Sequence, residues 1–269
     1  MSKTLISIGS LPVIRVLRPL YRNLLRALKR MSGLRSLRKL ERRWRSREFR
    51  PESSLRVVSL SEVPIVVINL PDRQDRLAGF KGEMRRLNVG HFRVVAGVAG
   101  KELFPNLPGD YSGAIGCNLA HSNAIEANDW ETETLLMVCE DDIEFLVDSN
   151  TLEALISEFE SNPYLDVLCL AGRVRGPRIP ISENLSVVTG VVGQACYVVK
   201  PQVVKPLANL WRSGVDDLAN LKLRGKNDII WNTLQREEAF FAFPRGRVAR
   251  QRASYSDIQG RQMPAQESN

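Results

Sequence analysis

The chain has 269 residues, of which 43% are hydrophobic, and a formal net charge of +8. That length and apolar fraction allow a full core in one large domain or two small ones. Only two histidines are present, and the four cysteines show no C-x-x-C spacing, which argues against a zinc site built from Cys and His. Buried free thiols suit a reducing cytosol, so we expect a cytoplasmic protein.

The positive charge is concentrated at the N-terminus. Residues 1–50 hold 15 Lys and Arg and 2 Glu, a net charge of +13. The remainder holds 23 basic and 28 acidic side chains, a net charge of −5. We therefore divide the chain into a basic arm (1–50), a linker (51–62), a globular domain (63–250) and a polar tail (251–269). No run of 18 apolar residues occurs, so no membrane-spanning helix is expected.

Two amphipathic helical patterns are expected in the arm. From Leu17 to Met31 the leucines fall on one arc of a helix and the arginines on the opposite arc. Ser32 and Gly33 are expected to end this helix, and a second leucine stripe runs from Leu34 to Trp44. Residues 12–47 could bind an anionic membrane surface, pack on the body or a partner, or bind nucleic acid. The regular leucine stripe favours the membrane, because a nucleic-acid arm does not need one. We therefore expect peripheral association with the inner face of the membrane.

The globular domain alternates strands and helices, which predicts an α/β fold with a mixed, mainly parallel central sheet flanked by helices. The β-branched apolar run after Val63 is typical of a buried parallel strand. From Arg245 the chain is polar and basic, and a loop or disordered tail is expected. The expected strands are 64–70, 91–98, 135–139, 165–170, two within 187–199, and 240–243; the expected helices are 73–87, 114–129, 152–159, 201–211 and 228–234.

Three carboxylates, Glu140, Asp141 and Asp142, directly follow the apolar run 135–139. Ligands of parallel α/β sheets bind beyond the carboxyl ends of the strands. Adjacent carboxylates repel one another, and a divalent cation relieves that repulsion. Hard carboxylate oxygens suit Mg²⁺ or Mn²⁺. An acidic cap on a following helix, or a solvated acidic turn, is the alternative, and spacing alone leaves both open. We call these three residues the acidic motif.

Five segments of the domain form an ordered series. Val67-Ile68-Asn69-Leu70 precedes Asp72-Arg73 and Asp75-Arg76; residues 113–122 read GAIGCNLAHS; the acidic motif follows; residues 193–199 read GQACYVV; and Asp228 precedes apolar residues and, later, Pro244. Over about residues 63–250 this series resembles the motifs of glycosyltransferase family 25, the lipopolysaccharide and lipooligosaccharide biosynthesis glycosyltransferases. The second segment departs from the family's G-x-I-G-C-x-L-S-H pattern at Ala120, which replaces the usual Ser.

The resemblance implies a GT-A-like single domain and an inverting, metal-assisted transfer. A sugar, with galactose favoured, would move from a UDP-sugar to a glycan or lipid-linked glycan acceptor. Asn69 and Leu70 would line the nucleotide pocket, and Arg73 or Arg76 would offset diphosphate charge. For both arginines an ordinary ion pair on a helix surface is the alternative.

The acidic motif and two further residues receive the chemical roles. Asp142 with Glu140 would hold Mn²⁺ or Mg²⁺ as a Lewis acid, and Asp141 would serve the donor, although the division between Glu140 and Asp141 stays open. Inversion also needs a base for the acceptor hydroxyl, for which Asp228 is the first candidate and His121 the second. A helix N-cap is the alternative role for Asp228, and a core histidine is the alternative for His121.

Two other functions compete with a membrane-associated glycosyltransferase. A metal-dependent phosphohydrolase could use the same acidic motif, but the presence of only two histidines argues against it. A non-catalytic membrane- or nucleic-acid-binding adaptor with a transferase-like fold is the other alternative.

Overall fold

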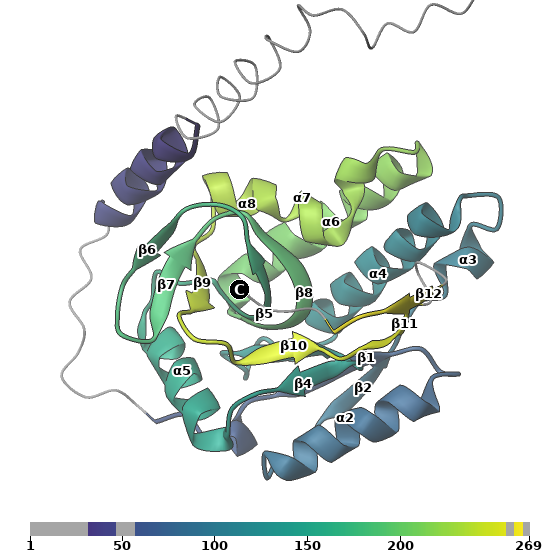
Figure 1. Cartoon of the computed structure of the whole chain (residues 1–269), viewed down its shortest axis with the longest axis horizontal. Coiled ribbons are helices and arrows are strands. Elements are labelled where there is room, and N and C mark those ends of the chain that lie inside the picture. The colour runs from purple at the N-terminus through teal and green to yellow at the C-terminus, as the bar shows by residue number, and fades with distance from the viewer. Residues whose placement is uncertain (1–31, 47–56, 257–260, 266–269) are drawn as a thin grey trace, which may run out of the picture.

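The computed structural model describes residues 32–46, 57–256 and 261–265 and shows an eight-stranded mixed sheet with helices on both faces (Figure 1). The strand order is β2-β1-β3-β8-β5-β9-β7-β6. Strands β2, β1, β3, β5, β9 and β6 run in one direction, and β8 and β7 run in the other. The predicted α/β class with a mixed, mainly parallel sheet is confirmed. The strands are β1 (Ile65–Asn69), β2 (Arg93–Ala96), β3 (Leu136–Glu140), β5 (Val167–Val174), β6 (Arg178–Pro180), β7 (Leu185–Val188), β8 (Val191–Val199) and β9 (Phe241–Pro244).

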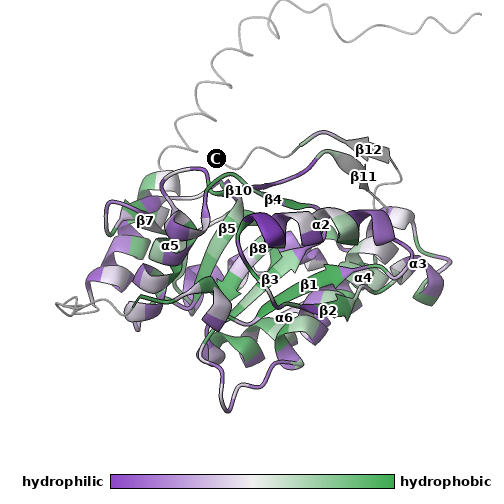
Figure 2. Ribbon diagram, turned by 90° about the horizontal axis from the view of Figure 1, so that it is seen from below, coloured by the Kyte–Doolittle hydropathy of each residue, from purple (hydrophilic) through white to green (hydrophobic). Residues whose placement is uncertain are grey.

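Two layers of helix give each face of the sheet its own apolar core. One core packs α2 and α5 against one face, and a second packs α4, α6 and α8 against the other. In Figure 2 the hydrophobic strands β1, β3 and β8 lie between α2 and α6. Burial on both faces explains why these strands are continuous apolar runs in the sequence. The helices are α2 (Gln74–Arg86), α3 (Gly100–Leu103), α4 (Gly109–Glu126), α5 (Ser149–Ser161), α6 (Pro201–Ala219), α7 (Asn227–Ile230) and α8 (Asn232–Glu237), with 3-10 turns η2 (Leu60–Glu62) and η3 (Leu223–Gly225).

Strand β3 divides its side chains between the two cores. Met137 and Cys139 enter the core under α2 and α5, whereas Leu136 and Val138 enter the core under α4 and α6. All four are fully buried. Because successive side chains of a strand point to opposite faces, the next residue, Glu140, faces α4 and α6.

Several boundaries differ from the sequence prediction. Strand β3 includes Glu140, α4 begins at Gly109, and α6 continues to Ala219. The predicted helix 228–234 is divided into α7 and α8 at Trp231. That indole is fully buried and donates to the Val191 carbonyl at 2.8 Å, so packing against β8 sets the break.

The segment after Arg245, predicted to be a loop and, from residue 251, a polar tail, forms strands instead. β10 pairs antiparallel with β4, and β11 pairs antiparallel with β12. Arg250 Nε lies 2.7 Å from Glu144 Oε2 across the first pair. Backbone pairing and this ion pair order a polar segment that shows no apolar periodicity. These strands are β4 (Ile143–Phe145), β10 (Ala249–Gln251), β11 (Ser254–Ser256) and β12 (Arg261–Met263).

The described part of the basic arm is a helix, residues 32–45, that packs on the body. Leu40 is 2% exposed, and the Trp44 ring meets the Phe240 ring edge-on at 5.2 Å between centroids. The Arg43 guanidinium lies over the same phenyl ring at 4.7 Å. Packing on the body therefore describes this part of the arm.

Ser32 and Gly33, predicted to end a helix, belong to the helix 32–45. The predicted stripe from Leu17 to Met31 lies outside the described residues. Among the described helices, none combines the length and the apolar character that crossing a bilayer requires.

Gly116 in α4 permits a close approach to the chain around α3. A Cβ at this position would lie 2.2 Å from the Val98 carbonyl oxygen and 2.8 Å from the Gly100 nitrogen. Gly116→Ala is therefore expected to lower the free energy of unfolding by roughly 1–3 kcal/mol, as overpacking does. Gly82→Ala in α2 is the matched control, because a Cβ there meets nothing within 4 Å. It should raise the same free energy by about 0.5–1 kcal/mol. Urea denaturation compares the two variants, and equal stabilities would contradict this account.

Candidate functional site

The ends of β1 and β3 place two predicted site residues side by side. In the register of these parallel strands Ile68 is opposite Glu140, so Asn69 and Asp141 follow at the same edge of the sheet. Asn69 is 3% exposed, and its Nδ2 donates to Asp141 Oδ2 at 2.7 Å. The same amide donates to Arg73 O at 3.0 Å. These contacts lie at the carboxyl edge, where parallel α/β sheets bind ligands.

The acidic motif is divided between the two faces of the sheet. Glu140 ends β3 and faces α4, where its Oε1 lies 3.4 Å from His121 Nε2. Asp141 faces α2, where its Oδ1 accepts from Arg76 Nη1 at 3.0 Å. The alternation that separates the two cores thus also separates the carboxylates. The motif is not a single cluster of three.

Arg76 and Asp141 form a buried ion pair, with side chains 16% and 6% exposed. Burial raises the pKa of Asp141, whereas the Arg76 charge and the Asn69 hydrogen bond lower it. Of the two arginines predicted to serve the donor, Arg76 therefore lies in the site and neutralises a buried carboxylate.

Arg73 has a different partner. Its guanidinium pairs at 3.1 Å with Asp75, whose side chain is 68% exposed, so the predicted alternative of a surface ion pair describes it. Leu70 is half-buried, and its carbonyl accepts the Arg73 N–H at 2.9 Å, which closes the turn after β1.

Asp142 and Glu140 are joined by a donor that the sequence did not indicate. Gln251 Nε2 donates to Glu140 Oε2 at 2.8 Å and to Asp142 Oδ1 at 3.4 Å, so these two oxygens face one point. Asp142 is 8% exposed. Burial, and then the Glu140 charge, raise the pKa of Asp142 to about 7, although Arg76 acts in the opposite direction.

The residue after β10 closes the same region through the backbone. Arg252 N donates to Asp142 O at 2.7 Å, and Arg252 Nη2 donates to Asp141 O at 2.9 Å. Sequence reasoning missed Arg252 and Gln251 because both follow Arg245, in the segment predicted to be a loop and polar tail. A strand of three polar or small residues carries no periodic signal that could have identified them.

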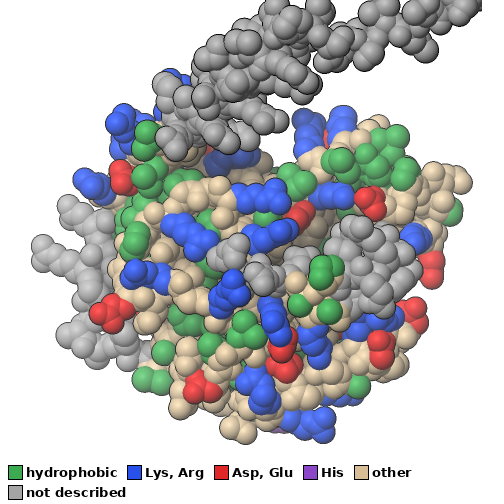
Figure 3. All heavy atoms as spheres, viewed as in Figure 1, with side chains coloured by type: hydrophobic (Ala, Val, Ile, Leu, Met, Phe, Trp, Pro, Cys, Tyr) green, Lys and Arg blue, Asp and Glu red, His purple; other side chains and the backbone are tan. Residues whose placement is uncertain are grey.

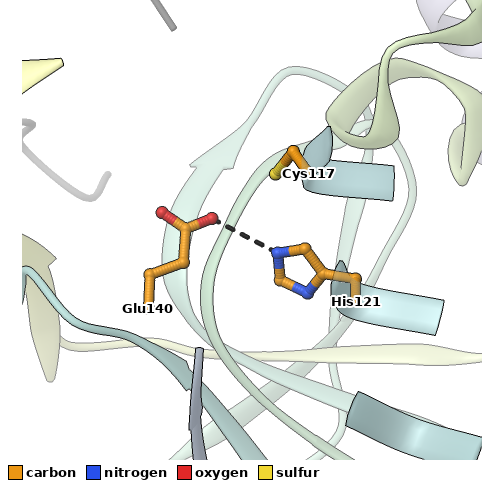
Figure 4. A group of neighbouring side chains, drawn as sticks. All are labelled: Cys117, His121 and Glu140. Carbon is orange, nitrogen blue, oxygen red and sulfur yellow. Dashed lines mark hydrogen bonds and ion pairs between the residues drawn. The ribbon is translucent and has the colours of Figure 1, made fainter. Parts of the chain in front are cut away.

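Cys117, His121 and Glu140 come together on the opposite face of the sheet (Figure 4). One ligand atom from each lies within 4.8 Å of the others. His121 is 1% exposed, and its Nδ1 lies 2.9 Å from the Tyr197 hydroxyl, while Nε2 faces Glu140. The ring also packs against Trp211 at 5.5 Å between centroids. His121 is thus a core histidine with both ring nitrogens engaged in the site.

Asp228 lies at the start of α7, where Lys226 and not Asp228 is the N-cap. Burial and the Glu140 charge raise its pKa, whereas Lys226 and Arg175 lower it. Its neighbour Asn227 donates from Nδ2 to Cys117 Sγ at 3.0 Å. The first turn of α7 therefore adjoins the Cys117 and His121 face of α4.

Asn227 is itself held by β8. Its Nδ2 donates to Gln194 Oε1 at 2.8 Å, and Gln194 Nε2 donates back to Asn227 O at 3.0 Å. Gln194 is 2% exposed. Both Gln194 and Tyr197 lie in the segment 193–199. The resemblance of this segment implied no role for either side chain.

No family model and no curated protein matches the chain. Among solved structures, it is similar to A197 from STIV, with 11% identity and a TM-score of 0.41 over 77% of this chain and 96% of that one. A glycosyltransferase involved in the glycosylation of the major capsid of PBCV-1 gives 8% and 0.40 over 67% and 81%. Mannose-1-phosphate geranyltransferase from Thermus thermophilus gives 12% and 0.35 over 74% and 76%. All three TM-scores lie below 0.5, so no activity follows from these similarities.

The buried ion pair is expected to show strong coupling. In a double-mutant cycle to alanine, Arg76 and Asp141 should couple by about 2–3 kcal/mol, because Arg76→Ala leaves the buried Asp141 carboxylate without its cation, and Asp141→Ala leaves Arg76 with the longer, 3.8 Å contact to Asp142. The pair Arg73 and Asp75, whose carboxylate is 68% exposed, is the control and should couple by less than about 1 kcal/mol. Guanidinium denaturation of the seven proteins, wild type included, measures both cycles. Equal coupling in the two cycles would contradict the assigned burial.

Asp142 is expected to make the protein less stable as pH rises. Its pKa is about 7 in the folded protein and 3.8 ordinarily, so the folded state holds the proton more tightly than the unfolded chain. The free energy of unfolding should fall between these two pH values, by at most about 1.4 kcal/mol per pH unit. Asp142→Asn should reduce this fall relative to wild type in chelator-treated, metal-free buffer. Denaturation at about pH 5 and about pH 8 tests it, and identical pH dependence in both proteins would refute it.

Proposed function

We propose that this chain is a GT-A-like glycosyltransferase of lipopolysaccharide, lipooligosaccharide or other surface-glycan synthesis. It moves a sugar, with galactose favoured, from a UDP-sugar to a glycan or lipid-linked acceptor, with inversion and metal assistance. One observation supports this above all: the five segments that resemble family 25 motifs meet in one contact network. Asn69, His121, the acidic motif, Tyr197 and the residue before Asp228 are joined by the hydrogen bonds given above.

The donor is assigned to the α2 side of this edge. Asn69, Leu70 and Asp141 form the turn and the carboxylate beside which the nucleotide would lie. Arg76 and Arg73 supply hydrogen-bond donors and positive charge for the diphosphate. Each is already paired with a carboxylate, Arg76 with Asp141 and Arg73 with Asp75, so the proposed cation has to offset the remaining diphosphate charge.

The proposed Mn²⁺ or Mg²⁺ is assigned to Glu140 and Asp142. The Glu140 Oε2 and Asp142 Oδ1 oxygens face the same Gln251 amide, so two hard oxygens already converge on one point. Rotation of that amide by half a turn would present its own oxygen to a cation. A divalent cation at this position supplies Lewis-acid stabilisation of the diphosphate.

Asp228 is assigned as the base that accepts the proton of the acceptor hydroxyl. It is half-buried, and its raised pKa makes the carboxylate a better proton acceptor. His121, the second candidate, has one ring nitrogen on Tyr197 and the other on Glu140. We therefore assign His121 to positioning Glu140.

The acceptor side includes the proposed membrane contact of residues 12–47. In the helix 32–45, the apolar side chains Leu40 and Trp44 pack on the body, whereas Leu34 is 55% exposed, so its remaining surface combines one leucine with basic side chains. Lys and Arg side chains also extend across the face of the body shown in Figure 3. Each basic residue near an anionic surface contributes about 1 kcal/mol. Four arginines and one glutamate gather on the open surface of this helix: Arg35, Arg38, Glu41, Arg42 and Arg45.

Removal of the base is expected to slow turnover without loss of donor binding. Asp228→Asn should lower kcat by about 10²–10⁴-fold, the usual contribution of general base catalysis, with UDP affinity unchanged. The measurement is UDP release from UDP-galactose, UDP-glucose and UDP-N-acetylglucosamine. Asp217→Asn is the control, because Asp217 pairs with Arg224 on the surface, and it should keep wild-type turnover.

Calorimetric titration with UDP, with and without Mn²⁺, tests the donor half of the proposal. Metal-dependent UDP binding supports it. A wild-type protein that binds no UDP would overturn it and favour the non-catalytic adaptor. Undiminished turnover in Asp142→Ala would remove the metal assignment alone.

A further inference from the structure

We propose that Cys117, His121 and Glu140 form a second cation site, which takes a borderline-soft divalent ion, Zn²⁺ in the first place. Cys117 and His121 are four residues apart in α4 and so lie one turn apart on one face of the helix. Glu140 reaches them from the end of β3 (Figure 4). Among the described residues, these three side chains form a group of possible metal ligands, because one ligand atom from each lies within 4.8 Å of the others.

The spacing of the ligand atoms fits a tetrahedral ion. Nitrogen and oxygen ligands about 2.0–2.1 Å from zinc lie about 3.3–3.4 Å apart in a tetrahedron. His121 Nε2 and Glu140 Oε1 are 3.4 Å apart. A thiolate about 2.3 Å from the ion would lie about 3.5 Å from the His121 nitrogen and the Glu140 oxygen. The Cys117 sulfur therefore has to move toward these two atoms by little more than about 1 Å.

The groups behind the ligands hold them in a coordinating orientation. The Tyr197 hydroxyl lies 2.9 Å from His121 Nδ1, which directs Nε2 toward Glu140. Asn227 Nδ2 donates to Cys117 Sγ at 3.0 Å and thereby favours the thiolate. Metal-binding histidines are held through their other nitrogen in this way. The alternative is that His121 and Glu140 only form a hydrogen bond with each other. That alternative does not explain why the Cys117 thiol lies beside them with the Asn227 amide as its donor.

The chemistry of the three ligands selects the metal. A thiolate and an imidazole prefer Zn²⁺ to Mg²⁺ or Mn²⁺, which prefer oxygen. Burial, and then the charges of Glu140, Asp228 and Asp142, raise the pKa of the Cys117 thiol, so a cation here would offset concentrated negative charge and favour the thiolate. Three protein ligands with a fourth position left for water are the pattern of catalytic rather than structural zinc.

This site reverses an expectation from the sequence. The absence of C-x-x-C spacing and the two histidines argued against zinc held by Cys and His. Spacing along the chain does not show ligands that come from different elements. Here the third ligand, Glu140, is 19 residues from His121 and belongs to another element.

The test uses the full-length reduced protein, stripped with a chelator and titrated with Co²⁺, which replaces Zn²⁺ and is coloured. We expect one equivalent to bind with a thiolate-to-cobalt charge-transfer band in the near ultraviolet, and Zn²⁺ to abolish the band. Cys117→Ser should lose the band. Cys196→Ala should keep it, because Cys196 enters the opposite core. Absence of the band in wild type, or its persistence in Cys117→Ser, would overturn the proposal.

A second variant separates coordination from folding. Asn227→Ala keeps all three ligands and should weaken Zn²⁺ affinity about 10–100-fold, as loss of a supporting hydrogen bond does. Competition with a zinc indicator measures this affinity, and unchanged affinity would contradict the supporting role. No nucleotide is present in these titrations. A cobalt band without UDP binding therefore supports this site and rejects the proposed function. UDP binding without a cobalt band supports the proposed function and rejects this site.

Discussion

Three consecutive carboxylates at the end of a buried strand must each find a donor or a cation at a sheet edge, because an uncompensated buried charge costs several kcal/mol. The two-residue alternation of β3 meets part of this constraint by directing Glu140 toward α4 and Asp141 toward α2. The partners of the carboxylates come from different elements, and two are shared: Gln251 by Glu140 and Asp142, and Arg76 by Asp141 and Asp142. Arg76 brings α2 to the edge, Asn69 brings the end of β1, and His121 brings α4. The compensation of this charge therefore assembles the site.

The same constraint explains why the chain after Arg245 returns to the sheet. Gln251 and Arg252 provide side-chain and backbone donors to the acidic motif, and β10 is held in place by pairing with β4, which directly follows that motif. The polar side chains of this segment gain order from hydrogen bonds to buried acceptors, which are stronger when the acceptor is charged. Val248 and Ala249 add buried apolar contacts. Strand β10 and Arg252 are thus a part of the candidate site and not an appendage to it.

How far sequence reasoning reached depended on whether a signal was local. Continuous apolar runs located the buried strands of the sheet but not the short strands β4 and β6. The order of the elements gave the α/β class, because burial on both faces leaves a local pattern. One more step of alternation, from Cys139 to Glu140, would have shown that Glu140 and Asp141 face opposite sides. The stripe containing Leu40 and Trp44 was correctly seen as apolar, but an amphipathic helix has the same pattern whether its partner is a membrane or a protein core. Gln251 had no local signal, since its role comes from acceptors distant in the chain.

Glu140 connects the two proposed cation positions through its two oxygens. Oε1 faces His121 and Cys117, whereas Oε2 faces Gln251 and, through it, Asp142. The Glu140 charge raises the pKa values of both Asp142 and Asp228. A cation bound to either oxygen would offset that charge and so lower both pKa values. Within the proposed function, the proton affinity of the assigned base then follows from the occupancy of Glu140. Because one carboxylate, Glu140, lies between both cation positions, the pKa of Asp228 depends on whether a cation is bound.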